Sequence, residues 1–231
     1  MNRPIKRTAG VIALLLVSLS VNAQTTGSGS AGRQVADTHV QQGVADIPDF
    51  GSVTGSNYAN KYFGLTLRIP SGWSVQDSDI KKQMNEKGKE LVTSNDPAKK
   101  VELVRAIDNT LNLLTISERP LGSPGFNPMF ICGAEKPPAG AKTIADYMVS
   151  LKNTLKYAQL TITIEKDVYS EQFGGVAFAG IDFDTNYSGT IVSQKCYARI
   201  VKDYVLFFIV VYQTDEQLKN ETEILKSVVL R

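Results

Sequence analysis

Asp182 and Asp184 are the acidic residues best placed to do chemistry together. They stand two positions apart in the segment 176–184, which we expect to be a strand, so their side chains project from the same face. Two carboxylates in this arrangement are suited to binding Ca²⁺ with help from carbonyl oxygens, or to acting as a general acid and base. The alternative is a solvated strand end, because turn-forming residues follow at 185–189 and acidic side chains are mostly exposed.

Histidine chemistry is confined to one position, because His39 is the only histidine of the chain. It stands in a polar N-terminal segment, where we interpret it as a solvent-exposed spacer and not as a metal ligand. The remaining sequence therefore has no Ser–His–Asp triad, no Cys–His pair and no histidine-based zinc site. It also lacks the GxSxG, HExxH, P-loop and EF-hand patterns. We accordingly predict no catalytic residue, no metal and no cofactor, and a protein that is not an enzyme.

The two cysteines, Cys132 and Cys196, stand 64 positions apart and form no CxxC pattern. This spacing does not favour a redox or metal-binding pair. Two alternatives stay open, a structural disulfide between the two cysteines and a pair of buried thiols. An oxidising compartment permits the disulfide, but sequence spacing does not show that the bond geometry is met.

Residues 1–23 have the three parts of a secretory signal peptide. Arg3, Lys6 and Arg7 precede the apolar run 9–21, and Val-Asn-Ala at 21–23 offers a small-residue cleavage pattern. An uncleaved anchor is the alternative, but the apolar run of about 13 residues is shorter than the roughly 20 that a spanning helix needs. We therefore expect the mature chain to be secreted or periplasmic and to contain no membrane-spanning segment.

Removal of this segment changes the charge of the protein. The full chain has a formal net charge of +2. The segment holds three cations and no acid, so the 25 basic residues become 22 against 23 acidic ones, which leaves a net charge of about −1. A nearly neutral chain gives no electrostatic reason to expect nucleic acid or an anionic membrane as a partner.

The mature chain divides into a polar segment and a globular domain. Residues 24–57 contain a Gly- and Ser-rich stretch near their start and lack apolar periodicity, which predicts a flexible linker. The domain then occupies 58–231. A strand at 65–69 ends at Pro70, and Trp73, the single tryptophan, follows a turn and is expected to plug the end of the core. We expect further helices at 77–92, 144–155 and 214–230, and strands at 101–107, 111–117, 160–168, 176–184, 190–201 and 204–212.

Some of these elements have specific local signals. Thr143 and Asp146 fit a capping box at the start of the helix 144–155, and Thr214 is placed to cap the final helix. The dipeptide 202–203 indicates a tight hairpin between the last two strands, and 108–110 indicates a hairpin between the strands 101–107 and 111–117.

A long connection is expected at 119–142, which contains five prolines and four glycines. A loop of this length within a compact domain is either functional or packed by its own side chains. Phe126, Met129 and Phe130 are the residues that would serve as a docking surface in the first case and as the packing in the second.

The segment 204–212 is apolar throughout, which is typical of a central strand covered on both faces. Strands that follow one another along the chain favour an antiparallel sheet with helices packed on its faces. The sequence therefore predicts an α+β fold, a three-layer α/β/α sandwich with a central and mostly antiparallel sheet.

The start of the domain resembles the PsbP-like fold family. The resemblance rests on a short set of residues, namely Tyr58, Asn60, Phe63-Gly64-Leu65, Ile69-Pro70 and Gly72-Trp73, and on the paired strands and helix at the C-terminal end. The family includes the extrinsic subunit of photosystem II. The resemblance implies the same sandwich over 58–231 and brings no catalytic residues, since members mostly act as binding or assembly factors.

From these observations we expect an exported, non-catalytic binding or assembly-factor domain whose partner is an envelope protein or a larger assembly. Two alternatives stay open. One is a carboxylate-dependent hydrolase that uses Asp182 and Asp184, and the other is a carrier of a small molecule or of Ca²⁺.

Overall fold

The computed structural model describes residues 48–231 except 91, 93, 139, 159 and 188. The predicted signal peptide 1–23, His39 and the predicted linker up to residue 47 lie outside the described residues. Among the described helices, none is long and apolar enough to cross a membrane.

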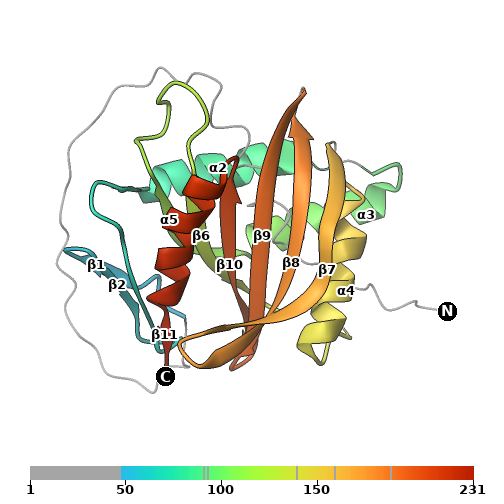
Figure 1. The fold of residues 1–231 in the computed structure, drawn as a ribbon. Coiled ribbons are helices and arrows are strands. Elements are labelled where there is room, and N and C mark those ends of the chain that lie inside the picture. Colours follow the sequence, from blue (N-terminus) through green and yellow to red (C-terminus); the bar gives the residue numbers. More distant parts are fainter. Residues whose placement is uncertain (1–47, 91, 93, 139, 159, 188) are drawn as a thin grey trace.

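A seven-stranded sheet runs through the centre of the molecule in the order β4-β5-β6-β10-β9-β8-β7 (Figure 1). Every neighbouring pair in it is antiparallel. The strands are β4 (Ser74–Val75), β5 (Leu111–Ser117), β6 (Met129–Glu135), β7 (Thr161–Phe173), β8 (Val176–Tyr187), β9 (Thr190–Val201) and β10 (Tyr204–Tyr212). The middle strand is β10, whose residues 205–211 are all buried. The expectation of a central strand covered on both faces is therefore confirmed.

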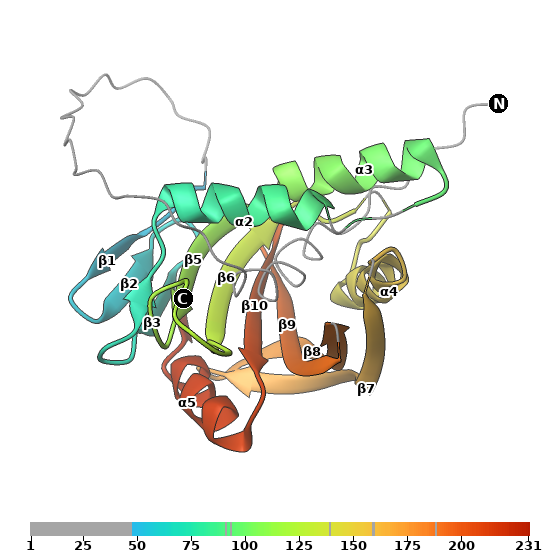
Figure 2. The same cartoon turned by 90° about the horizontal axis from the view of Figure 1, so that it is seen from above.

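One face of the sheet packs against the helices α2 (Ser78–Glu90), α3 (Pro97–Asp108) and α4 (Ile144–Leu155), as Figure 2 shows from above. Met84 of α2, Ile107 of α3 and Leu151 of α4 share a buried cluster with Phe207 and Ile209 of β10. The predicted capping box starts α4, because the Thr143 hydroxyl accepts from the Asp146 amide and the Asp146 carboxylate accepts from the Thr143 amide.

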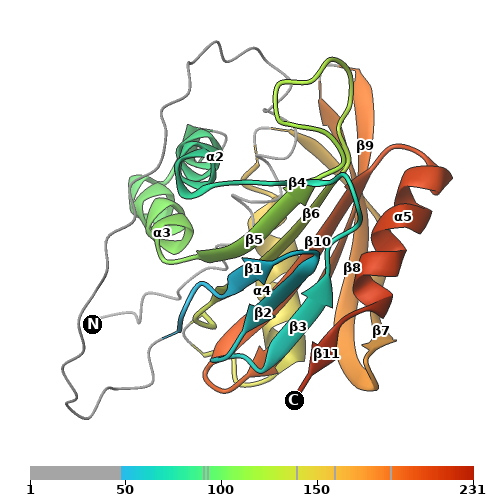
Figure 3. The same ribbon diagram turned by 90° about the vertical axis from the view of Figure 1, so that its left-hand side faces the viewer.

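The opposite face is covered by α5 (Asp215–Lys226) and by a small antiparallel sheet at one side (Figure 3). The small sheet has the order β1-β2-β3-β11, with β1 (Ser52–Thr54), β2 (Asn57–Asn60), β3 (Leu65–Arg68) and β11 (Val229–Leu230). Leu65 and Leu67 of this sheet and Ile224 of α5 share a second buried cluster with Phe208 and Val210 of β10. Side chains of β10 thus alternate between two cores, and the predicted three-layer α+β sandwich is confirmed.

The opening motif joins the two ends of the domain. The Gly64 carbonyl oxygen accepts a hydrogen bond of 3.0 Å from the Arg231 amide. Gly64 has a positive φ of 63°, and a Cβ atom at this position would lie 2.3 Å from the Arg231 carbonyl oxygen, so only glycine fits. Trp73 is half-buried and packs against the second cluster at the end of the sheet.

The domain begins earlier than residue 58. Strand β1 lies inside the predicted linker 24–57, and it pairs with β2 at the start of the predicted domain. The Tyr58 hydroxyl donates to the Phe50 carbonyl oxygen at 3.0 Å, and the Asn60 side chain donates to the Asp49 carbonyl oxygen at 2.8 Å. The last residues of the predicted linker are therefore part of the domain, because side chains of β2 bind their backbone.

The predicted strand 101–107 and its hairpin are wrong, because these residues form α3. Asp96 caps this helix by accepting from the amides of Ala98 and Lys99, and Pro97 occupies its first turn. The buried residues of this segment are Leu103 and Ile107, which stand four positions apart. Two side chains that stand four positions apart lie on the same face of a helix.

The predicted loop 119–142 is wrong in its second half, which contains β6. This strand pairs with both β5 and β10, and all of its residues are buried. Gly133 lies opposite Phe207 and Ala134 opposite Leu206, so small residues make room for the large ones of β10. The prolines and glycines of 119–142 suggested a loop, but of these residues only Gly133 lies in β6, where the large side chain of Phe207 requires a small partner in a densely packed strand.

Candidate functional site

The sheet is covered unequally on the side of α5. Figure 1 shows α5 in front of β10 and β6, while no described helix lies in front of β8 and β9. We call this part, which no described helix covers, the open face; its exposed and half-buried side chains surround the buried residues Asp182 and Tyr197. The register of β7, β8, β9 and β10 arranges its side chains in cross-strand rows, because directly opposed residues point to the same side. The rows are Ile191–Asn186–Thr161, Tyr212–Ser193–Asp184–Thr163, Lys195–Asp182–Lys166 and Tyr197–Gly180–Tyr169.

Asp182 is the centre of the open face and is 9% exposed. One carboxylate oxygen accepts a hydrogen bond of 2.6 Å from the Tyr169 hydroxyl, and the other lies 2.5 Å from the Lys195 ammonium. The Lys195 and Asp182 side chains are only 20% and 12% exposed, so solvent screens this ion pair weakly. Both oxygens of Asp182 are thus engaged by donors from the two neighbouring strands.

Two tyrosines extend this cluster toward the hairpin of β7 and β8. The Tyr169 and Tyr197 rings meet edge to face at 6.2 Å, and their hydroxyls lie 3.3 Å apart. Lys166 places its ammonium 3.7 Å from the centre of the Tyr169 ring. A Cβ atom at Gly180 would lie 2.7 Å from the Tyr169 ring, so the missing side chain is what lets the ring lie on the strand.

Burial perturbs the tyrosines of this region. Burial is the main cause that raises the pKa of Tyr197 to about 12, and the carboxylates of Asp182 and Glu171 add to it while the Tyr169 hydrogen bond opposes it. Burial also raises the pKa of Tyr169, together with its hydrogen bonds to Asp182 and Tyr197. Both phenols are therefore neutral hydrogen-bonding groups at physiological pH.

Asp184 shares the face with Asp182, as the strand pattern predicted, but its surroundings differ. It is half-buried and lies between Ser193 and Thr163 in its row. Among the interactions of the described residues, none pairs the Asp184 carboxylate with a cation or a hydrogen-bond donor. The structure thus places the two predicted aspartates in different roles, one engaged and one available.

The neighbouring residue Tyr212 lies near several acidic side chains. Burial is the largest cause that raises its pKa to about 12, and the carboxylates of Asp182, Asp184, Glu221 and Asp215 raise it further. Tyr212 is half-buried at the end of β10, directly opposite Ser193.

This geometry is suited to recognition more than to bond cleavage. Asp182 has no free oxygen with which to accept a substrate proton, since Tyr169 and Lys195 occupy both. A Ca²⁺ ion would find one available carboxylate at Asp184, and the described residues contain no group of three or more His, Cys, Asp or Glu side chains arranged for a metal.

The other predicted binding residues do not join this face. Met129 and Phe130 lie on β6, buried in the first and the second cluster respectively. Phe126 is half-buried against the first cluster. Arg119 holds the loop that carries it by donating to the carbonyl oxygens of Pro124 and Phe126. The interpretation as a docking surface is therefore wrong for Met129 and Phe130, because both belong to a strand of the central sheet and are buried in the cores on its two faces.

Of the two alternatives left open for the cysteines, the structure supports the pair of buried thiols. Cys132 on β6 belongs to the second cluster and Cys196 on β9 to the first, so their side chains point to opposite faces of the sheet. Strand β10 lies between the two strands, and both thiols are free and buried. Burial raises the pKa of each thiol, which keeps both protonated and unreactive at neutral pH.

Sequence analysis missed two buried acids. The Glu135 carboxylate accepts from the Tyr147 hydroxyl at 2.7 Å and from the Thr110 hydroxyl at 3.2 Å. Glu221 of α5 is fully buried, and neither of its carboxyl oxygens has a hydrogen-bond partner among the described residues. A signal for Glu221 was present, since it stands on the apolar stripe of the final helix between Leu218 and Leu225.

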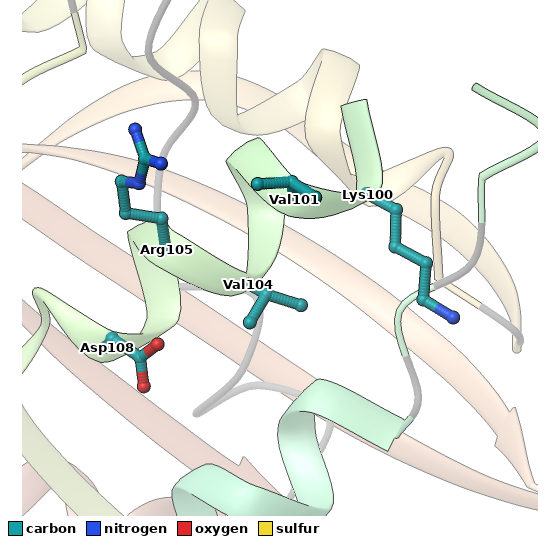
Figure 4. Close-up of a pocket in the computed structure, with 5 residues that line it drawn as sticks. All are labelled: Lys100, Val101, Val104, Arg105 and Asp108. Atoms are coloured by element: carbon teal, nitrogen blue, oxygen red, sulfur yellow. The ribbon is translucent and has the colours of Figure 1, made fainter. Parts of the chain in front are cut away.

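A shallow cavity of about 400 Å³ on the outer side of α3 was missed as well. Figure 4 shows the side chains that line it, Lys100, Val101, Val104, Arg105 and Asp108, all from this one helix. Val101 is 57% exposed there. The misassignment of 101–107 as a strand concealed this surface, which the Asp96–Pro97 cap signal would have revealed.

No protein-family model matches the chain, and no curated protein matches it. Among solved structures it is similar to the cyanobacterial PsbP of Synechocystis, at 10% identity over 78% of this chain and 98% of that one, with a TM-score of 0.47. It is also similar to LpqN, involved in cell envelope biogenesis of Mycobacterium tuberculosis, at 13% identity over 80% and 89% of the chains, with a TM-score of 0.42. A protein of unknown function from Pseudomonas aeruginosa matches at 19% identity over 51% and 81% of the chains, with a TM-score of 0.39. A PsbP is thus among the structures that this chain resembles, as the opening motif predicted, and the likeness concerns the fold alone.

Proposed function

We propose that this protein is an exported, non-catalytic binding domain that docks to a component of the cell envelope through its open face. The observation that carries the proposal is the position of Asp182, which is held between Tyr169 and Lys195 on a sheet face that no described helix covers. The signal-peptide pattern of residues 1–23 supports export.

The chemistry of the face supports docking. Tyrosine contributes a large contact area and loses little conformational freedom, and aromatic residues are enriched at protein interfaces. Here Tyr169, which is half-buried, is held in place by the buried Tyr197, by Gly180 and by Asp182 before a partner arrives. Binding to such a preorganised surface requires little further ordering of side chains.

The alternatives have less support from the same residues. A carboxylate-dependent hydrolase needs an acid or base with a free oxygen, and of the two aspartates Asp182 and Asp184 the second alone offers one. A Ca²⁺ carrier needs several oxygen ligands in one place, whereas the Asp182 carboxylate is already paired with the Lys195 ammonium. A thermal-shift series with Ca²⁺ and small metabolites tests the carrier directly, because a ligand that binds only the folded state raises the melting temperature.

The proposal is tested by photo-crosslinking in the native envelope fraction. A photoreactive amino acid replaces Ile191, which is 56% exposed on the open face, or Val149, which is 58% exposed on α4 on the opposite face. We expect one discrete crosslinked species from position 191 at native abundance, competed away by excess unlabelled mature protein and absent from position 149. Equal patterns from the two positions, or no crosslink at position 191, would contradict the proposal.

A further inference from the structure

The end of the open face near α5 differs in charge from the rest. In the row Lys195–Asp182–Lys166, the single acid is paired with Lys195. One row further, Asp184 has no counter-ion among the described residues, and the remaining members of its row are Thr163, Ser193 and Tyr212. The negative charge of Asp184 is therefore available to a binding partner.

The register also gives this place a shape. Tyr212 and Asp184 lie on either side of Ser193, so their Cα atoms are separated by two strand spacings, roughly 10 Å. The Ser193 side chain is shorter than both neighbours, so a third side chain has room to approach between them. That side chain would meet a carboxylate on one side and an aromatic ring on the other, a combination that favours a cation over an anion.

The electrostatics of Tyr212 agree with this geometry. After burial, the carboxylates of Asp182, Asp184, Glu221 and Asp215 raise its pKa. Asp182 is paired with Lys195, and burial keeps the proton on Glu221, which leaves Asp184 and Asp215 as the negative charges beside Tyr212. A positive group placed beside Tyr212 would therefore be stabilised by the surrounding charges, and its approach would be steered by them.

We propose that the site between Asp184 and Tyr212 binds a lysine or arginine side chain of a protein partner, with Ser193 beneath it. This inference rests on the proposed function, since it assigns the charge of the group that the open face recognises. The guanidinium or ammonium group pairs with the Asp184 carboxylate and lies against the Tyr212 ring.

The test uses the mature chain with a short oligolysine peptide and an oligoglutamate peptide of the same length, followed by backbone NMR shifts. We expect oligolysine to shift the resonances of Asp184, Ser193 and Tyr212, with binding that weakens as salt is added, and oligoglutamate to shift none of them. Asp184→Asn should weaken oligolysine binding about threefold to tenfold. Asp79→Asn is the matched control, because Asp79 is an exposed acid on α2, and it should leave the binding unchanged.

Two results of this experiment would overturn the inference. Oligolysine shifts that map elsewhere, or equal binding by the Asp184→Asn variant, would remove the cation site. The crosslink from position 191 separates this failure from that of the proposed function. A crosslink that persists undiminished in Asp184→Lys would leave the open face as a docking surface and exclude a cationic side chain at this site, whereas absence of the crosslink in the unsubstituted chain would remove the docking surface itself.

Discussion

Asp182 on β8 and Lys195 on β9 stand directly opposite each other in the sheet, and their side chains form an ion pair at 2.5 Å. Tyr169, from the next strand on the other side, donates to the second oxygen of the same carboxylate. Three strands thus meet at one acidic residue, and the cluster has a single arrangement because each donor is fixed by the register of its own strand.

Removal of the Asp182 side chain should destabilise the fold. Asp182→Ala leaves Lys195 without its counter-ion and Tyr169 without its acceptor, which we expect to lower the free energy of unfolding by about 2 kcal/mol, the scale of one hydrogen bond to a charged group. Urea unfolding measures this. Asp167→Ala is the control, because Asp167 pairs with Lys152 in a more exposed ion pair and should cost at most about 1 kcal/mol. Equal losses in the two variants would show that the Asp182 cluster has no special stability.

Gly180→Ala should displace the Tyr169 ring, because the added methyl group would lie 2.7 Å from it. Overpacking of this kind costs about 1–3 kcal/mol. In a Tyr169→Ala background the same substitution should cost little, since the ring is gone. A double-mutant cycle by chemical unfolding compares the two costs, and identical costs in both backgrounds would contradict the contact.

The two thiols should behave as buried cysteines that are not bonded to each other. Cys132 and Cys196 lie on opposite faces of the sheet, and burial raises the pKa of both. Ellman's reagent should therefore detect no thiol in the folded protein and both after denaturation, and a reducing agent should leave the melting temperature unchanged. A drop in melting temperature on reduction would demonstrate a disulfide and refute the placement of these strands.

Glu221 should make stability depend on pH. Burial, with a contribution from Glu118, raises its pKa well above the ordinary value of 4.5. The folded state therefore keeps a proton that the unfolded state releases above that ordinary value, so this group lowers the stability progressively as pH rises toward the folded-state pKa.

Glu221→Gln, which stays neutral, should remove this part of the pH dependence. As the pH rises from 4 to 8, the variant should become more stable relative to the original chain. Urea unfolding at each pH measures the two free energies of unfolding. The titratable groups that interact with Glu221 are Glu118 and the phenol of Tyr212. Glu118→Gln, which removes the other carboxylate, serves as the comparison. Parallel pH curves for the original chain and Glu221→Gln would show that the buried group is ionised in both states.

Local signals predicted several elements correctly because the interactions that define them lie within a few residues. Thr143 and Asp146 bind each other's backbone amides, and Thr214 accepts from the Gln217 amide at the start of α5. Lys202, with a φ of 54°, and Asp203 form the tight turn between β9 and β10. The apolar run 204–212 required cover on both faces, and this alone predicted the layered architecture.

The errors arose where local pattern and long-range packing disagree. Residues 101–107 were predicted to form a strand, but the helix cap at Asp96 and the burial of Leu103 and Ile107, four positions apart, decided for a helix. The prolines and glycines of 119–142 suggested a loop and concealed β6. The large side chains that require small partners at Gly133 and Ala134, those of Phe207 and Leu206, stand more than seventy positions away.

For the open face, the sequence by itself determined that Asp182 and Asp184 share one side of a strand, because side chains alternate along any strand. Only the tertiary structure decided that Lys195 and Tyr169 engage the first of them and leave the second available, because the register between strands depends on the packing of both cores. The faces of Cys132 and Cys196 were decided in the same way, since β10 separates their strands and no local pattern relates one face to the other.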